Sequence, residues 1–158
     1  MKYRMLTSEE LTHLEEELKQ FLIINHVYKE EWERMNRDTP ETAQNLVGLF
    51  SDQVLQRVYE NITYLEHRSK DACLVFKLGK DSIEMIGLQK KDNDSDIVTF
   101  ETPESIHVAL SVHPKQVGFF KHTKAYTKQR EEEIHQMIEQ GCVKSSEEFW
   151  KLLMEVVE

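Results

Sequence analysis

Apolar residues recur at helical spacing through the first part of the chain. Thr7 and Glu10 fit a capping box, in which the hydroxyl and the carboxylate each accept a hydrogen bond from a backbone N–H at the start of a helix. The apolar positions that follow are Leu11, Leu14, Leu18, Phe21 and Leu22. Together these features predict a first helix from Ser8 to Asn25.

Two further helices are predicted before the periodicity changes. The shorter one carries one stripe of residues, Tyr28, Glu31, Trp32 and Met35. The longer one begins at Thr39-Pro40, since proline suits the first helical position. Its expected buried stripe is Ala43, Leu46, Val47, Phe50, Val54 and Val58. Ser51 is also a good N-cap residue, so a break there is the alternative to the single helix that we expect.

The middle of the chain has strand character. Tyr64 to His67 reads as the entry to a strand, and residues 72–78 and 82–89 read as two strands joined by Gly79-Lys80-Asp81. One expected face holds Leu74, Phe76, Ile86 and Leu88, and the other holds Cys73, Val75, Ile83 and Met85. Because both faces are apolar, we expect both to be covered, by helices or by a second subunit.

The segment that follows, residues 97–122, combines strand periodicity with signals for a helix. Ile97 to Phe100 is expected to form a short strand, and Val117 to His122 a longer one. Thr102-Pro103 signals the start of a helix. The residues after it, Ile106, Val108, Leu110 and Val112, alternate as in a strand. We expect residues 104–112 to be helical, with a strand as the alternative.

Two helices are predicted at the end of the chain. The first spans Lys128 to Gln140 and stops at Gly141, the residue type favoured just past a helix terminus. Ser145 with Glu148 fits a second capping box, which predicts a last helix continuing through Val157. The fold class is therefore α+β, with N-terminal helices, a small, mostly antiparallel sheet of three to five strands, and C-terminal helices. With no linker or repeat visible, we expect residues 1–158 to form a single domain.

Composition and charge restrict the class of protein and its expected location. The chain has 158 residues, with 20 basic and 29 acidic side chains and a net charge of −9. Its two cysteines, Cys73 and Cys142, have no paired spacing, which argues against a disulfide scaffold. The N-terminus lacks the apolar stretch of a signal peptide, and no apolar run is long enough to span a membrane. We expect a cytoplasmic protein.

A series of short motifs resembles a known family. In order they are Met1-Lys2-Tyr3-Arg4, Leu6-Thr7, Glu10-Leu11, Phe21-Leu22, Glu31-Trp32, Phe50-Ser51-Asp52, Tyr64-Leu65-Glu66-His67 and Gln140-Gly141. The chain is similar over nearly its whole length to an uncharacterised family of small bacterial proteins classed as a domain of unknown function. The resemblance implies a cytoplasmic bacterial protein and supplies no catalytic residues.

Catalytic and cofactor motifs are absent from the sequence. None of the seven histidines is followed by another four residues on, so no helix face offers two imidazoles to a metal, and we expect neither metal nor cofactor. Cys142 follows Gly141 at a helix C-terminus, where a thiolate is disfavoured, and it suits a structural contact better than nucleophilic catalysis. An enzyme is therefore the third of our functional hypotheses, and no catalytic residue is assigned.

A basic stretch with aromatic residues supports the second hypothesis. No acidic residue lies between Pro114 and Arg130, and Phe119, Phe120 and Tyr126 lie among the cations. The candidate contacts for RNA or a phosphate ligand are Lys115, Lys121, His122, Lys124, Lys128 and Arg130. Cations bind phosphates and aromatic rings stack on bases, whereas the alternative is a strand with core aromatics and solvated lysines.

The last predicted helix supports the leading hypothesis. One apolar stripe consists of Phe149, Leu152, Leu153 and Val156, and a second consists of Trp150, Met154 and Val157. A helix that is apolar on most sides is buried on most sides, either within the fold or against a partner. We expect a non-enzymatic protein-interaction module whose second stripe forms the interface with a partner protein or with a second copy of the chain.

Overall fold

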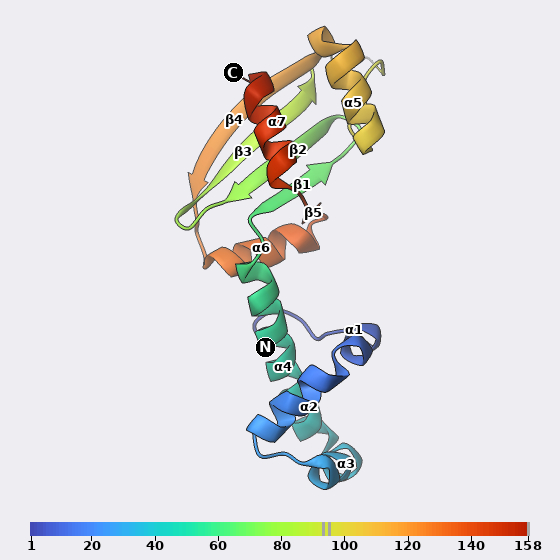
Figure 1. Ribbon diagram of the computed structural model, residues 1–158, viewed down its shortest axis with the longest axis vertical. Helices are drawn as coiled ribbons and strands as arrows, with labels where there is room; N and C mark the ends of the chain where they lie inside the picture. Colours follow the sequence, from blue (N-terminus) through green and yellow to red (C-terminus); the bar gives the residue numbers. More distant parts are fainter. Residues whose placement is uncertain (93, 95, 158) are drawn as a thin grey trace. The chain divides into compact units, whose positions relative to one another are not determined.

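The computed structural model describes residues 1–92, 94 and 96–157, and the side chain of Val157 lies outside this description. The chain divides into two compact units, an N-terminal unit of Met1–Glu60 and a C-terminal unit of Asn61–Glu158. Helices precede and follow a five-stranded antiparallel sheet, so the predicted α+β class is confirmed (Figure 1). The expectation of one domain over residues 1–158 stays a prediction.

The N-terminal unit begins with helix α1, Ser8–His13, and helix α2, Glu15–Ile24. The predicted capping box of Thr7 and Glu10 is confirmed. The prediction of one helix from Ser8 to Asn25 is wrong, because Leu14 leaves the helical conformation at φ −110° and ψ 23°. Neither glycine nor proline stands at this position, so the sequence carries no signal for the break.

Helix α3, Lys29–Asp38, and helix α4, Pro40–Glu60, complete the N-terminal unit. The long third helix is confirmed as one piece. Its buried residues are Ala43, Gly48, Phe50, Ser51, Leu55 and Tyr59, so the expected stripe is partly wrong, and Val58 is 47% exposed. Ser51 can be buried because its hydroxyl oxygen accepts a hydrogen bond from the Leu6 N–H at 3.1 Å and its hydroxyl donates to the Val47 carbonyl at 2.7 Å.

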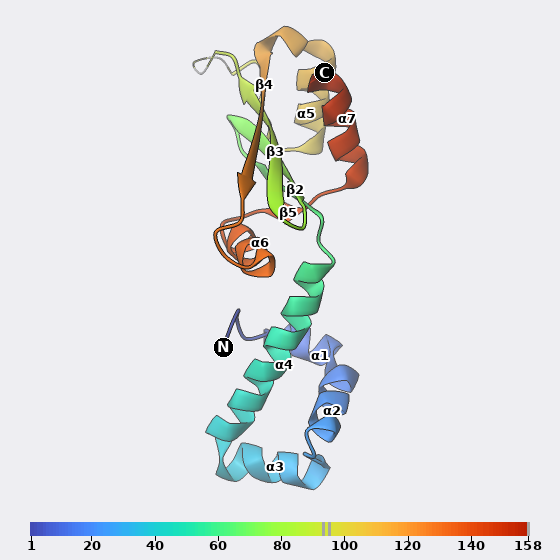
Figure 2. The same cartoon turned by 90° about the vertical axis from the view of Figure 1, so that its left-hand side faces the viewer.

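The C-terminal unit is built on one sheet with the strand order β4-β3-β2-β1-β5. Its strands are β1 Tyr64–Arg68, β2 Ala72–Leu78, β3 Ser82–Lys90, β4 Val117–Ala125 and β5 Val143–Lys144. All neighbouring strands are antiparallel, which confirms the predicted hairpin and the strand beginning at Val117. Helices α5, Pro103–Val112, and α7, Glu147–Val157, lie on the same side of this sheet (Figure 2).

The prediction of which hairpin side chains share a face of the sheet is wrong. Leu78 lies opposite Ile83, so four residues, 79–82, separate the first paired residues of the hairpin, although Ser82 belongs to β3 through its pairing with β4. A shift of one residue in the pairing reverses which side chains of the second strand share a face with the first. Cys73 and Val75 therefore share a face with Leu88 and Ile86.

The two faces of the hairpin differ in how well they are covered. Cys73, Val75, Ile86 and Leu88 are completely buried on the side of α5 and α7, in one apolar cluster with Phe100 and Trp150. On the other side, Leu74, Phe76 and Met85 are half-buried. Helices thus bury these four apolar residues, and a covering second subunit stays a prediction.

Residues 97–100 do not form the expected strand. Val98 and Phe100 are 3% and 0% exposed and belong to the apolar cluster, yet their backbone joins no ladder. Their alternation reflects side chains that reach the core from an irregular segment. By contrast, α5 confirms the helical choice for residues 104–112, with Thr102 and Ser105 forming a capping box at its start.

The ends of the last two helices are set by local hydrogen bonds. Helix α6, Arg130–Glu139, ends as predicted, with Gly141 at φ 107° and its N–H donating to Ile138 while Cys142 donates to Met137. The second predicted capping box is wrong by one residue. The oxygen of Ser146, not Ser145, accepts the N–H of Phe149 at 3.2 Å and so begins α7.

The two apolar stripes of α7 face different surroundings from those predicted, because residues of the expected interface stripe pack in the core. Trp150 is 5% exposed and packs in the core with Leu153, which is completely buried, and Met154 packs against the same cluster. Trp150 therefore packs in the core of the C-terminal unit, with its ring centroid 6.2 Å from that of Tyr64, and a role for it in a partner interface stays a prediction. The outward residues are Leu152 and Val156, 49% and 44% exposed. The side chain of Val157 lies outside the described residues.

Candidate binding groove

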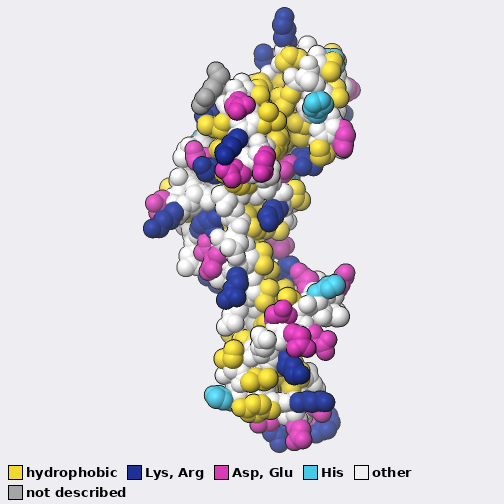
Figure 3. Space-filling model, in the orientation of Figure 1, with side chains coloured by type: hydrophobic (Ala, Val, Ile, Leu, Met, Phe, Trp, Pro, Cys, Tyr) yellow, Lys and Arg dark blue, Asp and Glu magenta, His cyan; other side chains and the backbone are white. Residues whose placement is uncertain are grey.

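A groove of about 430 Å³ lies between α5 and α7 over strand β1. Its apolar lining consists of Pro103, Ile106, Leu110, Phe149, Leu152 and Val156. Its polar lining consists of Glu66, Arg68, His107, Ser111 and Ser146. Figure 3 shows apolar side chains gathered on the surface between the two helices. We call this feature the α5–α7 groove.

The walls of the α5–α7 groove follow from helical periodicity. On α7, Phe149, Leu152 and Val156 are three and four residues apart and share one side of the helix, while Trp150 and Leu153 face the sheet. On α5, Ile106 is buried and Leu110 is half-buried one turn later. Each helix thus has an apolar side that the core of the C-terminal unit buries only in part.

The floor of the α5–α7 groove holds an ion pair. Glu66 and Arg68 are two residues apart on β1, so both side chains lie on the sheet face that α5 and α7 cover. The Arg68 Nε–H donates to Glu66 Oε2 at 2.5 Å, and the two side chains are 29% and 5% exposed. A carboxylate this well buried requires such a partner, because an unpaired buried charge is strongly unfavourable.

A buried thiol lies beside the ion pair. Cys73 is the cross-strand neighbour of Arg68 and is completely buried. Burial, with a smaller contribution from the charge of Glu66, raises the pKa of Cys73 to about 12. Burial also raises the pKa of Cys142. Both sulfurs are therefore protonated thiols at neutral pH and poor nucleophiles.

The rim hydroxyls take part in helix hydrogen bonds. The Ser111 hydroxyl donates to the His107 carbonyl at 2.6 Å, and the Ser146 oxygen accepts the Phe149 N–H at 3.2 Å. Neither hydroxyl is positioned by a neighbouring base, as nucleophilic catalysis requires. Among the described residues, no group of three or more His, Cys, Asp and Glu is placed to hold a metal ion.

The six predicted RNA or phosphate contacts are spread over several elements. Lys121, His122 and Lys124 are exposed on the edge strand β4, where the alternation of a strand directs Lys121 to one face and the other two to the opposite face. Lys115 lies in the short helix η1, Pro114–Gln116, and Lys128 lies in the loop before α6. RNA binding by these residues stays a prediction.

Arg130 and the nearby aromatic residues have structural contacts. The Arg130 guanidinium donates to the carbonyls of Ile62, Leu78 (3.1 Å) and Gly79 (3.2 Å). The Tyr126 hydroxyl donates to the same Gly79 carbonyl at 2.6 Å. The ring of Phe120 lies directly over Gly87, where a Cβ atom would be 2.1 Å from it. Arg130 and Tyr126 thus connect α6 and the segment before it to the hairpin turn, and Phe120 packs on β3.

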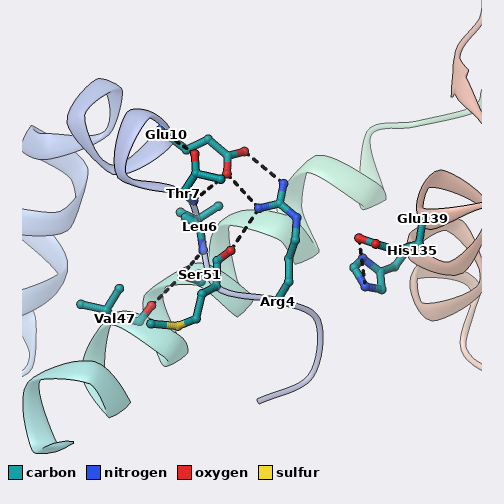
Figure 4. Close-up of polar contacts among 9 residues, drawn as sticks. Arg4, Leu6, Thr7, Glu10, Val47, Ser51, His135 and Glu139 are labelled. Atoms are coloured by element: carbon teal, nitrogen blue, oxygen red, sulfur yellow. Dashed lines mark hydrogen bonds and ion pairs between the residues drawn. The ribbon is translucent and has the colours of Figure 1, made fainter. Parts of the chain in front are cut away.

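A polar cluster anchors the N-terminal segment within its own unit (Figure 4). Arg4 contacts Glu10 through two hydrogen bonds, Nη1 to Oε1 at 2.8 Å and Nη2 to Oε2 at 3.0 Å. The Thr7 N–H donates to the same carboxylate at 2.8 Å. These hydrogen bonds, that of Arg4 first, lower the pKa of Glu10 to about 2.

The substitution Glu10→Gln is expected to reduce stability only where the wild-type carboxyl is ionised. Because the folded pKa is about 2 and the ordinary value is 4.5, the carboxylate contributes fully above pH 4.5 and loses this contribution as the pH falls towards 2. The side chain is 38% exposed, so we expect a loss of only about 0.5 kcal/mol at neutral pH. Thermal unfolding of both proteins between pH 7 and pH 2 measures it. A difference that grows on acidification would contradict the assignment.

Sequence comparison places the chain in a family. One family model matches the whole chain, residues 1–158, and its description is Family of unknown function (DUF6495). This match confirms the resemblance seen in the sequence. Comparison with curated proteins and with solved structures finds no significant match. Across the described residues, no helix has both the length and the apolar character needed to cross a membrane.

Proposed function

We propose that this chain, which belongs to the Family of unknown function (DUF6495), is a binding protein whose α5–α7 groove holds a small apolar molecule. The observation that carries the proposal is a groove of about 430 Å³ whose walls are apolar and whose floor holds a buried ion pair. Ligand pockets typically measure about 300–1,000 Å³ and combine mostly apolar linings with a few polar groups. The proposal takes the protein to be bacterial and cytoplasmic, as the sequence resemblance implies.

The half-exposed wall residues supply a driving force for binding. Leu152 and Val156 are 49% and 44% exposed on a helix whose other side is buried. Removing the exposed halves of two such side chains from water contributes about 1–2 kcal/mol, before any contribution from the ligand's own apolar surface. An apolar ligand would also contact Phe149 and Leu110, which are already half-buried.

The size of the groove favours a small molecule over a protein partner. A stable protein interface buries about 800 Å² on each partner. The groove walls are formed by helices of 10 and 11 residues, and Trp150, the strongest interface candidate in the sequence, is buried in the core. We therefore propose small-molecule binding in place of the protein-interaction module that the sequence favoured. Self-association is an outcome that size measurements on the same samples would detect.

Substitution of one groove wall tests the proposal. Leu152→Gln is expected to weaken binding of the neutral fluorescent apolar probe N-phenyl-1-naphthylamine by about tenfold, because a polar side chain would replace an apolar contact. The matched control is Val108→Gln, since Val108 is 45% exposed on α5 and does not line the groove. Fluorescence titration measures both. Equal affinities in the two variants would place the probe elsewhere and refute the proposal.

A further inference from the structure

The ion pair on the groove floor has hydrogen-bonding capacity that the protein itself does not use. The contact between Glu66 and Arg68 joins Nε to Oε2 and does not involve the terminal guanidinium nitrogens or Glu66 Oε1. Among the described residues, none forms a hydrogen bond to these atoms. Both side chains line the α5–α7 groove, so the remaining donors and acceptor are available to a bound molecule.

The charge of the floor restricts the head group of that molecule. Glu66 and Arg68 together carry no net charge, and Glu66 is only 4% exposed. A carboxylate ligand would place a second anion beside a buried carboxylate, and an ammonium group would place a second cation beside Arg68. Both leave a net charge in a groove with apolar walls, which is unfavourable. A neutral head group avoids this penalty.

The arrangement of the two side chains also restricts the geometry of the head group. Since the guanidinium donates to the carboxylate at 2.5 Å, the terminal guanidinium nitrogens and Oε1 belong to two groups in direct contact, and one head group can reach both. A matching ligand must present an acceptor and a donor on one edge. A primary amide does so through its carbonyl oxygen and the N–H on the same side. A trans secondary amide, such as a peptide bond, directs its N–H and its carbonyl in opposite directions.

We propose that the α5–α7 groove binds an apolar molecule that ends in a primary amide. The carbonyl oxygen accepts a hydrogen bond from a terminal Arg68 nitrogen, and the amide N–H donates to Glu66 Oε1. The apolar part lies against Leu110, Phe149 and Leu152. This assignment rests on the proposed function, because it names the ligand class of the same groove.

Four probes with the same octyl-type chain test the assignment: octanamide, N-methyloctanamide, octanoate and octylammonium. Each is titrated against the full chain carrying bound N-phenyl-1-naphthylamine, and its displacing affinity is measured. Octanamide is expected to bind at least about tenfold more tightly than the other three, because it alone satisfies both charged partners without adding charge. Octanoate or octylammonium binding as tightly as octanamide would overturn the assignment.

Two variants separate the head-group contact from apolar binding. In the double variant Glu66→Leu with Arg68→Met, both charges are replaced together, and the preference for octanamide over octanoate is expected to disappear. Arg68→Lys keeps the charge and the partner of Glu66 but loses the planar donor pair, and a smaller preference is expected there. An unchanged preference in the folded variants would also overturn the assignment.

The two proposals fail in different ways. If all four probes displace the fluorophore from wild type equally, the groove binds apolar molecules and only the amide assignment is wrong. If none of the probes displaces the fluorophore and Leu152→Gln does not weaken its binding, the groove is not a binding site and both proposals are wrong.

Discussion

Trp150→Ala is expected to lower the free energy of unfolding by about 3–5 kcal/mol, the range for removing a large aromatic side chain from a core. Trp150 is 5% exposed and packs in the cluster that contains Cys73, Ile86 and Leu88. The loss combines the transfer of the indole to water with the cavity left beneath α7. Urea unfolding followed by circular dichroism measures it, since the helices and the sheet both contribute to the signal.

A second substitution on α7 serves as the control for Trp150→Ala. Leu152→Ala removes an apolar side chain that is 49% exposed on the outer side of the same helix, and we expect a loss below about 1 kcal/mol. The interface hypothesis makes the opposite prediction for Trp150: little loss of monomer stability and a shift from dimer to monomer. A loss under 1 kcal/mol accompanied by a change in molecular mass would contradict the core assignment.

Arg130→Met is expected to lower the free energy of unfolding by about 3 kcal/mol. The guanidinium donates to three backbone carbonyls, those of Ile62, Leu78 and Gly79, in the segment before β1 and at the hairpin turn. Hydrogen bonds that involve a charged group contribute about 1.5–3 kcal/mol each, and all three carbonyls would lose this donor, although Gly79 keeps that of Tyr126. Methionine keeps most of the apolar stem, so the loss reports on the polar contacts. Urea unfolding measures this change as well.

Lys128→Met is the matched control for Arg130→Met. Lys128 is exposed two residues earlier and was predicted, like Arg130, to contact RNA or a phosphate ligand. Its substitution is expected to change the stability by less than about 0.5 kcal/mol. If Arg130→Met were equally neutral and both variants weakened binding of single-stranded RNA at low salt, Arg130 would be a contact residue and not a structural one.

Local signals in the sequence were sufficient for most of the secondary structure. The box of Thr7 and Glu10, the proline at position 40 and the glycine at position 141 each mark a helix end through a short-range hydrogen-bonding need, so a single sequence reveals them. The hairpin strands were equally clear. Their register was not, because Ser82 pairs with β4 and not with β2, so Leu78 lies opposite Ile83, and a shift of one residue reverses every face.

The candidate site was harder to predict than the fold. Glu66 and Arg68 carry a usable signal, since opposite charges two residues apart on a strand share a face. The sequence does not say that this face is the buried one, and no groove was predicted around Glu66. On α7 both apolar stripes were visible, but which stripe meets the sheet depends on how the helix packs. Tertiary packing, and not the local sequence, therefore decides which stripe faces outward.

The most direct test of the α5–α7 groove is a two-dimensional ¹H–¹⁵N NMR titration of the full chain with octanamide. The account predicts that the amide resonances of Arg68, Leu110, Phe149 and Leu152 shift together and saturate with one affinity. The resonances of the Arg4 and Glu10 cluster in the N-terminal unit should not move. Shifts concentrated along Lys121 to Lys124, or no saturable shift in α5 and α7, would contradict the central claim.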